Sequence, residues 1–151
     1  SMKAQLLQRI RDRKAVVGII GLGYVGLPLA VEFAKAGFHV IGYDVSERVV
    51  ALLMSGKSHI QDVPDSDIAQ LVRNGTFEAT AVEARLSEAD AISIAVPTPL
   101  SKTRDPDMSY VIAAAEAATR QARRGDRIAI GCTRRLWRRH SRARRRNSRR
   151  V

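Results

Sequence analysis

A chain of 151 residues, 45% of them hydrophobic, is long enough for one domain with a substantial core. Its single cysteine, Cys132, excludes an internal disulfide and is typical of a reducing compartment. No apolar run is long enough to span a membrane, and the N-terminus lacks the apolar segment of a signal peptide, so we expect a cytoplasmic protein without a membrane partner.

The formal net charge of +11 is confined to one end of the chain. Residues 1–126 hold fifteen basic and fifteen acidic side chains, whereas residues 127–151 hold eleven arginines and no acid. Basic tails are typical of proteins that bind nucleic acid or other anions. Because the neutral remainder offers no basic face, we do not expect nucleic acid to be the partner of the domain itself.

Hydrophobic periodicity predicts the elements of the N-terminal half. Residues 3–14 favour a helix that packs beside the first strand, and residues 15–20 form an apolar run typical of a parallel strand covered on both faces. Residues 24–36 follow with helical spacing, and Gly37 is a natural stop. A second strand, 38–43, ends on Asp44.

The same alternation continues to about residue 131. The further elements that we expect are helices at 47–54, 65–74 and 108–122, a short helical turn at 82–86, and strands at 77–81, 90–96 and 127–131. Alternating strands and helices predict an α/β fold, a Rossmann-like doubly wound parallel sheet with strand order 3-2-1-4-5. The sheet would be incomplete, with an exposed edge that favours marginal stability or self-association.

The most informative motif is Gly21-x-Gly23-x-x-Gly26, which joins the first strand to its helix. In such a turn the first glycine permits the bend, the second leaves room for a pyrophosphate, and the third lets the helix pack close to the strand. Asp44 lies 23 positions after Gly21, where an acid can bind the adenosine ribose. A plain strand–turn–helix is the alternative, but the three coincident features favour a dinucleotide site.

The composition changes after Gly131. Ten of the residues between Arg134 and Arg150 are arginines, and such a segment cannot bury enough surface to offset its ordering entropy. We therefore divide the chain into a dinucleotide-binding domain, 1–131, and an Arg-rich tail, 132–151, that is disordered or a solvated helix. One hypothesis is that the tail is out-of-frame translation, with the true reading frame lost near Arg127. The other is that the tail binds nucleic acid.

Three stretches, GLGYVGLP, VIGYDVSE and VPTPLSKTRDPDMSYV, closely resemble the N-terminal NAD-binding domain of the UDP-glucose/GDP-mannose dehydrogenase family. The resemblance extends from about residue 16 to 125 and is strongest to the branch that oxidises UDP-N-acetylhexosamines, such as UDP-N-acetylglucosamine and UDP-N-acetylmannosamine. The alternative is another NAD-dependent dehydrogenase of related fold, such as a β-hydroxyacid type. That type shares the glycine turn but should lack VPTP with PDMSYV.

The resemblance implies a set of NAD contacts. Tyr24 and Val25 would offer backbone N–H groups to the pyrophosphate, within the turn shaped by Gly21, Gly23 and Gly26. Asp44 would accept hydrogen bonds from the ribose, and its charge would repel the 2′-phosphate of NADP.

Other contacts in this set have plainer alternatives. Arg48 would flank the ribose or adenine, or would simply be a surface residue. Val96, Pro97 and Thr98 would lie where the dinucleotide crosses the sheet edge, with Thr98 on the nicotinamide side; the alternative for Thr98 is a turn residue between two prolines.

The family oxidises the C6 alcohol of a UDP-sugar to an acid in two hydride transfers to two NAD⁺, and its full-length enzymes form homodimers. The resemblance places the catalytic cysteine and lysine in a later domain, so we assign this sequence no catalytic residue. We expect no metal site either, because His59 has no ligand partner at a usual spacing. The chain is expected to be a truncated piece that holds NAD weakly and does not turn over substrate.

Overall fold

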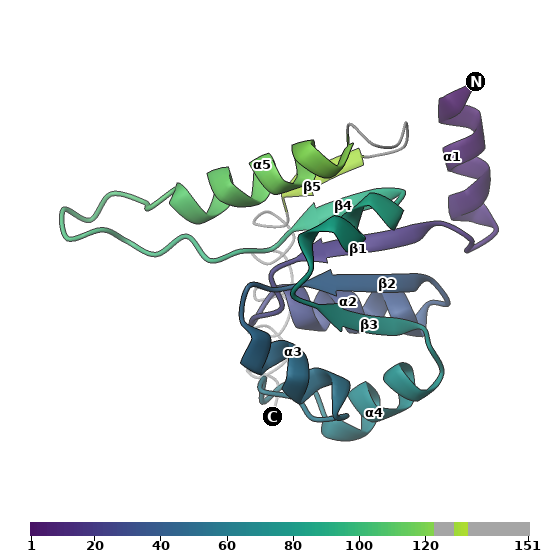
Figure 1. Ribbon diagram of the computed structural model, residues 1–151, viewed down its shortest axis with the longest axis horizontal. Helices are drawn as coiled ribbons and strands as arrows, with labels where there is room; N and C mark the ends of the chain where they lie inside the picture. Colours follow the sequence, from purple (N-terminus) through teal and green to yellow (C-terminus); the bar gives the residue numbers. More distant parts are fainter. Residues whose placement is uncertain (123–128, 133–151) are drawn as a thin grey trace, which may run out of the picture.

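The computed structural model describes residues 1–122 and 129–132. Its centre is a parallel sheet in which the strands lie in the order β3-β2-β1-β4-β5 (Figure 1). The strands are β1 (Val16–Ile20), β2 (His39–Tyr43), β3 (Phe77–Thr80), β4 (Ala91–Ile94) and β5 (Ala129–Cys132). The order 3-2-1-4-5 and the doubly wound fold predicted from the sequence are confirmed. Strand β5 extends through Cys132, one residue beyond the boundary that we expected for the domain.

Helices cover both faces of this sheet. The helices of the described residues are α1 (Met2–Arg11), α2 (Gly26–Lys35), α3 (Glu47–Met54), α4 (Asp65–Arg73), the short 3-10 helix η1 (Glu83–Glu88) and α5 (Ser109–Ala122). Helices α2, α3 and α4 lie on one face, and η1 and α5 pack on the other. None of the helices in the described part of the chain is long and apolar enough to cross a membrane.

The two faces have separate cores, because neighbouring residues of a strand point to opposite sides. Ile19 belongs to the core under α2, together with Leu27 of that helix and Phe77 of β3. Ile20 belongs to the other core, with Leu86 of η1 among its neighbours. The apolar run of β1 is therefore buried on both faces, as its composition predicts.

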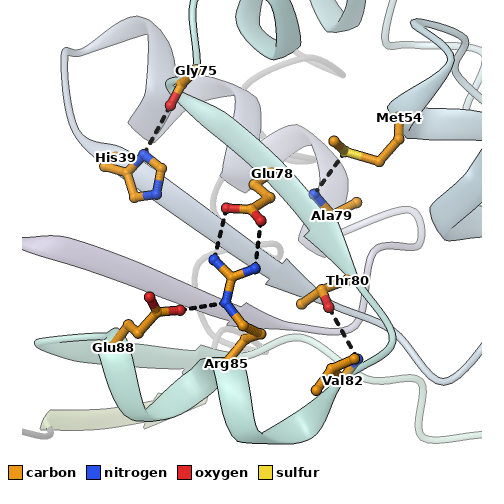
Figure 2. Close-up of polar contacts among 9 residues, drawn as sticks. All are labelled: His39, Met54, Gly75, Glu78, Ala79, Thr80, Val82, Arg85 and Glu88. Atoms are coloured by element: carbon orange, nitrogen blue, oxygen red, sulfur yellow. Dashed lines mark hydrogen bonds and ion pairs between the residues drawn. The ribbon is translucent and has the colours of Figure 1, made fainter.

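Strand β3 lies at one edge of the sheet and is tied to η1 by an ion-pair cluster (Figure 2). Arg85 donates to both carboxylate oxygens of Glu78 and also to Glu88. The hydrogen bonds from Arg85 to Glu78 hold the pKa of Glu78 below its ordinary value of 4.5, against an opposing effect of partial burial. The cluster places charged side chains at the sheet edge, which discourages pairing with another strand.

The expectation that the N-terminal helix packs beside the first strand is wrong. Helix α1 has no buried residue, and Leu7 and Ile10 of its apolar stripe are exposed. In Figure 1 it projects away from the sheet near the start of β1. Its side-chain link to the sheet is Arg9, which donates from Nε and Nη2 to Asp90 at 3.2 and 2.8 Å. A polar anchor at the helix end thus replaces the apolar packing that periodicity alone suggested.

The fourth strand is shorter than the predicted range 90–96. It covers Ala91–Ile94, and the carboxylate of Asp90, just before it, accepts from Arg9 and from the backbone N–H of Val16, the latter at 2.8 Å. At the other end the backbone leaves the sheet before Pro97, whose ring cannot donate to a ladder.

Candidate functional site

Three neighbouring strands end at the same level. Ile20 of β1 is in register with Tyr43 of β2 on one side and with Ile94 of β4 on the other. The next residues, Gly21 and Asp44, therefore leave the sheet side by side at its carboxyl edge. The chain runs from β1 to β2 in one direction and reaches β4 on the other side, so this is the topological switch point at which open α/β sheets bind ligands.

The glycine turn has distinct steric requirements at two of its positions. Gly21 has a φ of +95°, a left-handed conformation that disfavours a side chain, and a Cβ there would lie 2.9 Å from the carbonyl oxygen of Ala95. At Gly26 a Cβ would lie 1.6 Å from the carbonyl oxygen of Gly21, which is incompatible with this turn. Both glycines are thus required by the fold itself.

Gly23 differs from them. A Cβ at this position would meet no atom of the described chain within 4 Å. Packing within the domain therefore gives no reason for glycine at this position, whereas the approach of a ligand to the backbone does. This open position is the observation that best fits a bound pyrophosphate.

The turn also presents backbone donors. Within residues 1–122 and 129–132, no oxygen accepts from the N–H groups of Gly23, Tyr24, Val25 or Gly26. Helix α2 begins at Gly26 without a side-chain cap, and the Tyr24 side chain is 79% exposed. Free N–H groups at a helix N-terminus, with the partial positive charge of that end, form a site suited to an anion.

Asp44 lies against this turn. Its Oδ2 accepts from the backbone N–H of Leu22 at 2.9 Å, and its Oδ1 accepts from the N–H of Ser46 at 2.9 Å. The carboxylate is half-buried and directed toward the turn. Each oxygen keeps a second lone-pair direction that can accept from a ribose hydroxyl.

The remaining predicted contacts lie around the same edge. Arg48 is exposed in the first turn of α3 and makes no ion pair within the described residues. Val96 adjoins the turn, because a Cβ on Gly21 would lie 3.2 Å from its Cγ1. Pro97 is exposed and Thr98 is half-buried, both at the start of the long loop that Figure 1 shows reaching from β4 to α5. Of these residues, the geometry brings Val96 against the turn.

Sequence reasoning missed Leu22, the residue between the first two glycines. Its side chain is fully buried, and its N–H is the donor to Asp44. The apolar character of this position is visible in the sequence. Its link to Asp44 depends on a contact between residues 22 positions apart, which periodicity does not reveal.

A second ion-pair cluster lies on the face of the sheet covered by η1 and α5. Glu83 accepts from Nε and Nη2 of Arg120 at 3.0 Å each, which joins η1 to α5. Burial raises the pKa of Tyr43, at the end of β2, and the nearby charge of Glu83 raises it further. The Tyr43 phenol is therefore neutral at physiological pH and adds no charge beside Asp44.

No group of three or more His, Cys, Asp or Glu side chains that could hold a metal ion occurs in the described part of the chain. Of Cys132 the structure gives the backbone position in β5 alone. The carboxyl edge thus combines free backbone N–H donors with the carboxylate acceptor of Asp44.

Comparison with known proteins gives a consistent result. Residues 15–135 match the model of the UDP-glucose/GDP-mannose dehydrogenase family, NAD binding domain. The chain is 37% identical over 118 residues to UDP-N-acetyl-D-mannosamine dehydrogenase of Salmonella typhimurium, covering 78% of this chain and 27% of that protein. It is 38% identical over 119 residues to NDP-N-acetyl-D-galactosaminuronic acid dehydrogenase of Ralstonia nicotianae, with the same coverage.

A solved structure shows the same fold. GDP-mannose dehydrogenase of Pseudomonas aeruginosa, crystallised as a ternary complex, superposes with a TM-score of 0.72 at 28% identity. The match covers 78% of this chain and 28% of that one. The chain thus spans about a quarter of the length of the relatives that it matches.

The family match decides against the β-hydroxyacid type of dehydrogenase that the glycine turn alone left open. It includes the glycine turn, Asp44 and the segment after β4, which are the parts that the structure brings together at the carboxyl edge of the sheet. The chain belongs to the UDP-glucose/GDP-mannose dehydrogenase family and carries its NAD-binding domain.

Proposed function

We propose that NAD binds across the carboxyl edge of the sheet, with its pyrophosphate at the turn formed by residues 21–26. The N–H groups of Tyr24 and Val25 donate to the phosphate oxygens, and Gly23 leaves the space for them. The observation that carries this proposal is the open position at Gly23, where neither packing nor backbone strain requires a glycine.

Asp44 selects between the two nicotinamide coenzymes in this proposal. Its carboxylate, held against the turn by Leu22 N–H, accepts from the hydroxyls of the adenosine ribose. A 2′-phosphate at that position would bring two negative charges together, so NAD is preferred over NADP. Arg48 flanks the ribose or adenine, and Val96, Pro97 and Thr98 line the path toward the nicotinamide.

The enzyme to which this domain contributes is, we propose, a UDP-sugar 6-dehydrogenase acting on a UDP-N-acetylhexosamine. Support comes from the relatives named as acting on N-acetylated nucleotide sugars, at 37% and 38% identity. Bound NAD supplies a hydride acceptor, while the residues of this domain bind and orient it. We place the covalent step outside this domain, because the family resemblance puts the catalytic cysteine and lysine in a later domain. The reaction therefore needs groups from the rest of a family enzyme, which we propose to be a homodimer.

A titration tests the cofactor proposal. Isothermal calorimetry with NAD and NADP should show binding of NAD and weaker or no binding of NADP. Gly23→Val should abolish NAD binding without loss of thermal stability, since a Cβ at this position meets no atom of the described chain within 4 Å. Gln5→Val, which adds the same side chain on exposed α1, is the matched control and should bind like the parent chain. Equal affinity of Gly23→Val and the parent chain would refute the placement of the pyrophosphate.

A further inference from the structure

A glycine inside β2 has no place in the dinucleotide motif, yet it lies directly against the glycine turn. A Cβ on Gly42 would be 2.6 Å from Cδ2 and 3.0 Å from Cδ1 of Leu22. Leu22 is fully buried in the core under α2, and its backbone immediately precedes the free N–H groups of Gly23 and Tyr24. Because Gly42 has no side chain, Leu22 can pack directly on β2, and the turn lies close to the sheet.

Leu22 is held at two points. Its side chain occupies the space over Gly42, and its N–H donates to Oδ2 of Asp44 at 2.9 Å. One contact is steric and the other is a charge-assisted hydrogen bond, and both come from the end of β2. Together they fix the height of the turn above the sheet edge.

We propose that Gly42 is a positioning residue of the pyrophosphate site, which acts through Leu22 and touches no ligand. This inference rests on the proposed function for its ligand, but its steric part concerns the chain alone. A methyl group at Gly42 pushes Leu22 outward. The hydrogen bond to Asp44 then lengthens, and the N–H groups that follow Leu22 move away from the position in which they converge on an anion.

The chain supplies a matched control in Gly18 of β1. A Cβ there would be 3.1 Å from Cβ of Ala89 and 3.1 Å from Cγ1 of Ile92, on the opposite face of the sheet. Gly18→Ala and Gly42→Ala therefore both add one methyl group to a buried strand glycine. Only the methyl group of Gly42→Ala would contact a residue of the glycine turn, Leu22.

The first experiment needs no ligand. Hydrogen exchange of the Leu22 amide, measured by NMR relative to the Ile19 amide in β1, should be about tenfold faster in Gly42→Ala than in the parent chain. The same ratio should be unchanged in Gly18→Ala. An unchanged ratio in Gly42→Ala would overturn the inference, because it would mean that the turn stays in place.

The second experiment compares ADP with 2′,3′-dideoxy-ADP, which lacks both ribose hydroxyls. Gly42→Ala should weaken both by the same factor, about tenfold, as expected for the loss of one charge-assisted hydrogen bond. A loss confined to ADP would place the effect on Asp44 and the ribose, and would overturn the proposal for the turn. If the parent chain bound neither nucleotide, the proposed function would fail while the exchange ratio would still decide the role of Gly42.

A compensating change separates positioning from general damage. Leu22→Val removes the two δ-methyl groups that a Cβ on Gly42 would meet. The double variant Gly42→Ala/Leu22→Val should therefore recover part of the Leu22 amide protection and of the dideoxy-ADP affinity that the single variant lost. Purely additive losses in this cycle would contradict a steric contact between the two residues.

Discussion

The three glycines of the turn are required for different physical reasons. Gly21 supplies a left-handed backbone, Gly26 allows a carbonyl oxygen to lie where a Cβ would be, and Gly23 leaves open space. The sequence motif does not distinguish the roles of the three glycines. We expect their substitution to have different effects on the stability of the domain.

Gly26→Ala should destabilise the domain by about 3 kcal/mol, because the new methyl group cannot coexist with the carbonyl oxygen of Gly21. Gly23→Ala should change the free energy of unfolding by about 0.5 kcal/mol or less, as at an open surface position. Urea denaturation of both variants checks the difference. Equal destabilisation would show that the turn relaxes around either residue.

Asp44→Asn should weaken NAD binding by about tenfold or more, because ribose hydroxyls lose a charged acceptor. The same change should narrow the preference for NAD over NADP, since the repulsion of the 2′-phosphate is removed. Calorimetric titration with both coenzymes measures the two effects. Glu47→Gln, which removes an exposed carboxylate three residues away on α3, is the control and should keep the preference. An unaltered preference in Asp44→Asn would contradict the role of Asp44.

At the scale of single residues, the sequence predicts the atoms that face the ligand better than those that support them. Gly23 and Asp44 stand at motif spacings, so they can be found without a structure. Leu22 in the glycine turn contacts Gly42 in β2, and neither local sequence pattern predicts this contact.

Among the elements, the edge strand β3 depends on the carboxylate of Glu78. Because Arg85 lowers the pKa of Glu78, the ionised form is favoured in the folded state, and the resulting stability is present above about pH 4.5. This stability is lost as the pH falls through the lowered value. Glu78→Gln should therefore cost about 1 kcal/mol at pH 7, a modest figure because the pair is partly exposed to solvent.

Thermal unfolding of Glu78→Gln and the parent chain between pH 7 and pH 3 tests this dependence. The gap between their melting temperatures should close toward the acid end. Glu47→Gln, whose carboxylate lies outside the cluster, should show no such pH-dependent gap. A gap that persisted at pH 3 would mean that packing of the side chain, and not its charge, supports β3.

Helix α1 should detach when its anchor is removed. Arg9→Met keeps an apolar stem but loses both hydrogen bonds to Asp90, whose side chain is 4% exposed. We expect a loss of helical signal in far-ultraviolet circular dichroism and a cost of about 1–3 kcal/mol, since a buried carboxylate loses a partner. Arg11→Met, on the same helix, is the control and should leave the signal intact. Equal spectra for Arg9→Met and the parent chain would show that other contacts hold the helix.

The hydrophobic pattern of the sequence predicts which helices and strands exist, but it does not predict where α1 lies. Leu6, Leu7 and Ile10 form a stripe that normally packs on a core, yet the buried space beside β1 is taken by residues of α2 and η1. Likewise, the pattern of residues 90–96 could not reveal that Asp90 serves α1 and β1 with its side chain. Competition between elements for the same sheet surface is a tertiary effect.

For the whole molecule, the question is what the Arg-rich end contributes. The tail lies outside the described residues apart from Cys132, and the family match ends at residue 135. We propose that the domain functions without the tail. The strong positive charge and the coenzyme site are then independent properties of the chain.

Deletion of residues 136–151, which lie beyond the family match, should leave NAD affinity within about twofold of the parent chain. Calorimetry measures that affinity. Binding of an RNA oligonucleotide, if the tail causes it, should fall steeply with salt and vanish in the deletion. A large loss of NAD affinity in the deletion variant would contradict the proposal that the domain functions without the tail.

Translating the coding DNA in its other two reading frames tests whether the tail is out-of-frame. The hypothesis fails if neither frame encodes apolar patterns typical of strands and helices.

The attachment of α1 has a practical consequence. The helix leaves the sheet at the amino ends of the strands, and the glycine turn and Asp44 lie at the opposite ends. A linker fused before Ser1 therefore points away from the turn. Immobilising the protein on a biosensor chip through that terminus should leave nucleotide titrations undisturbed.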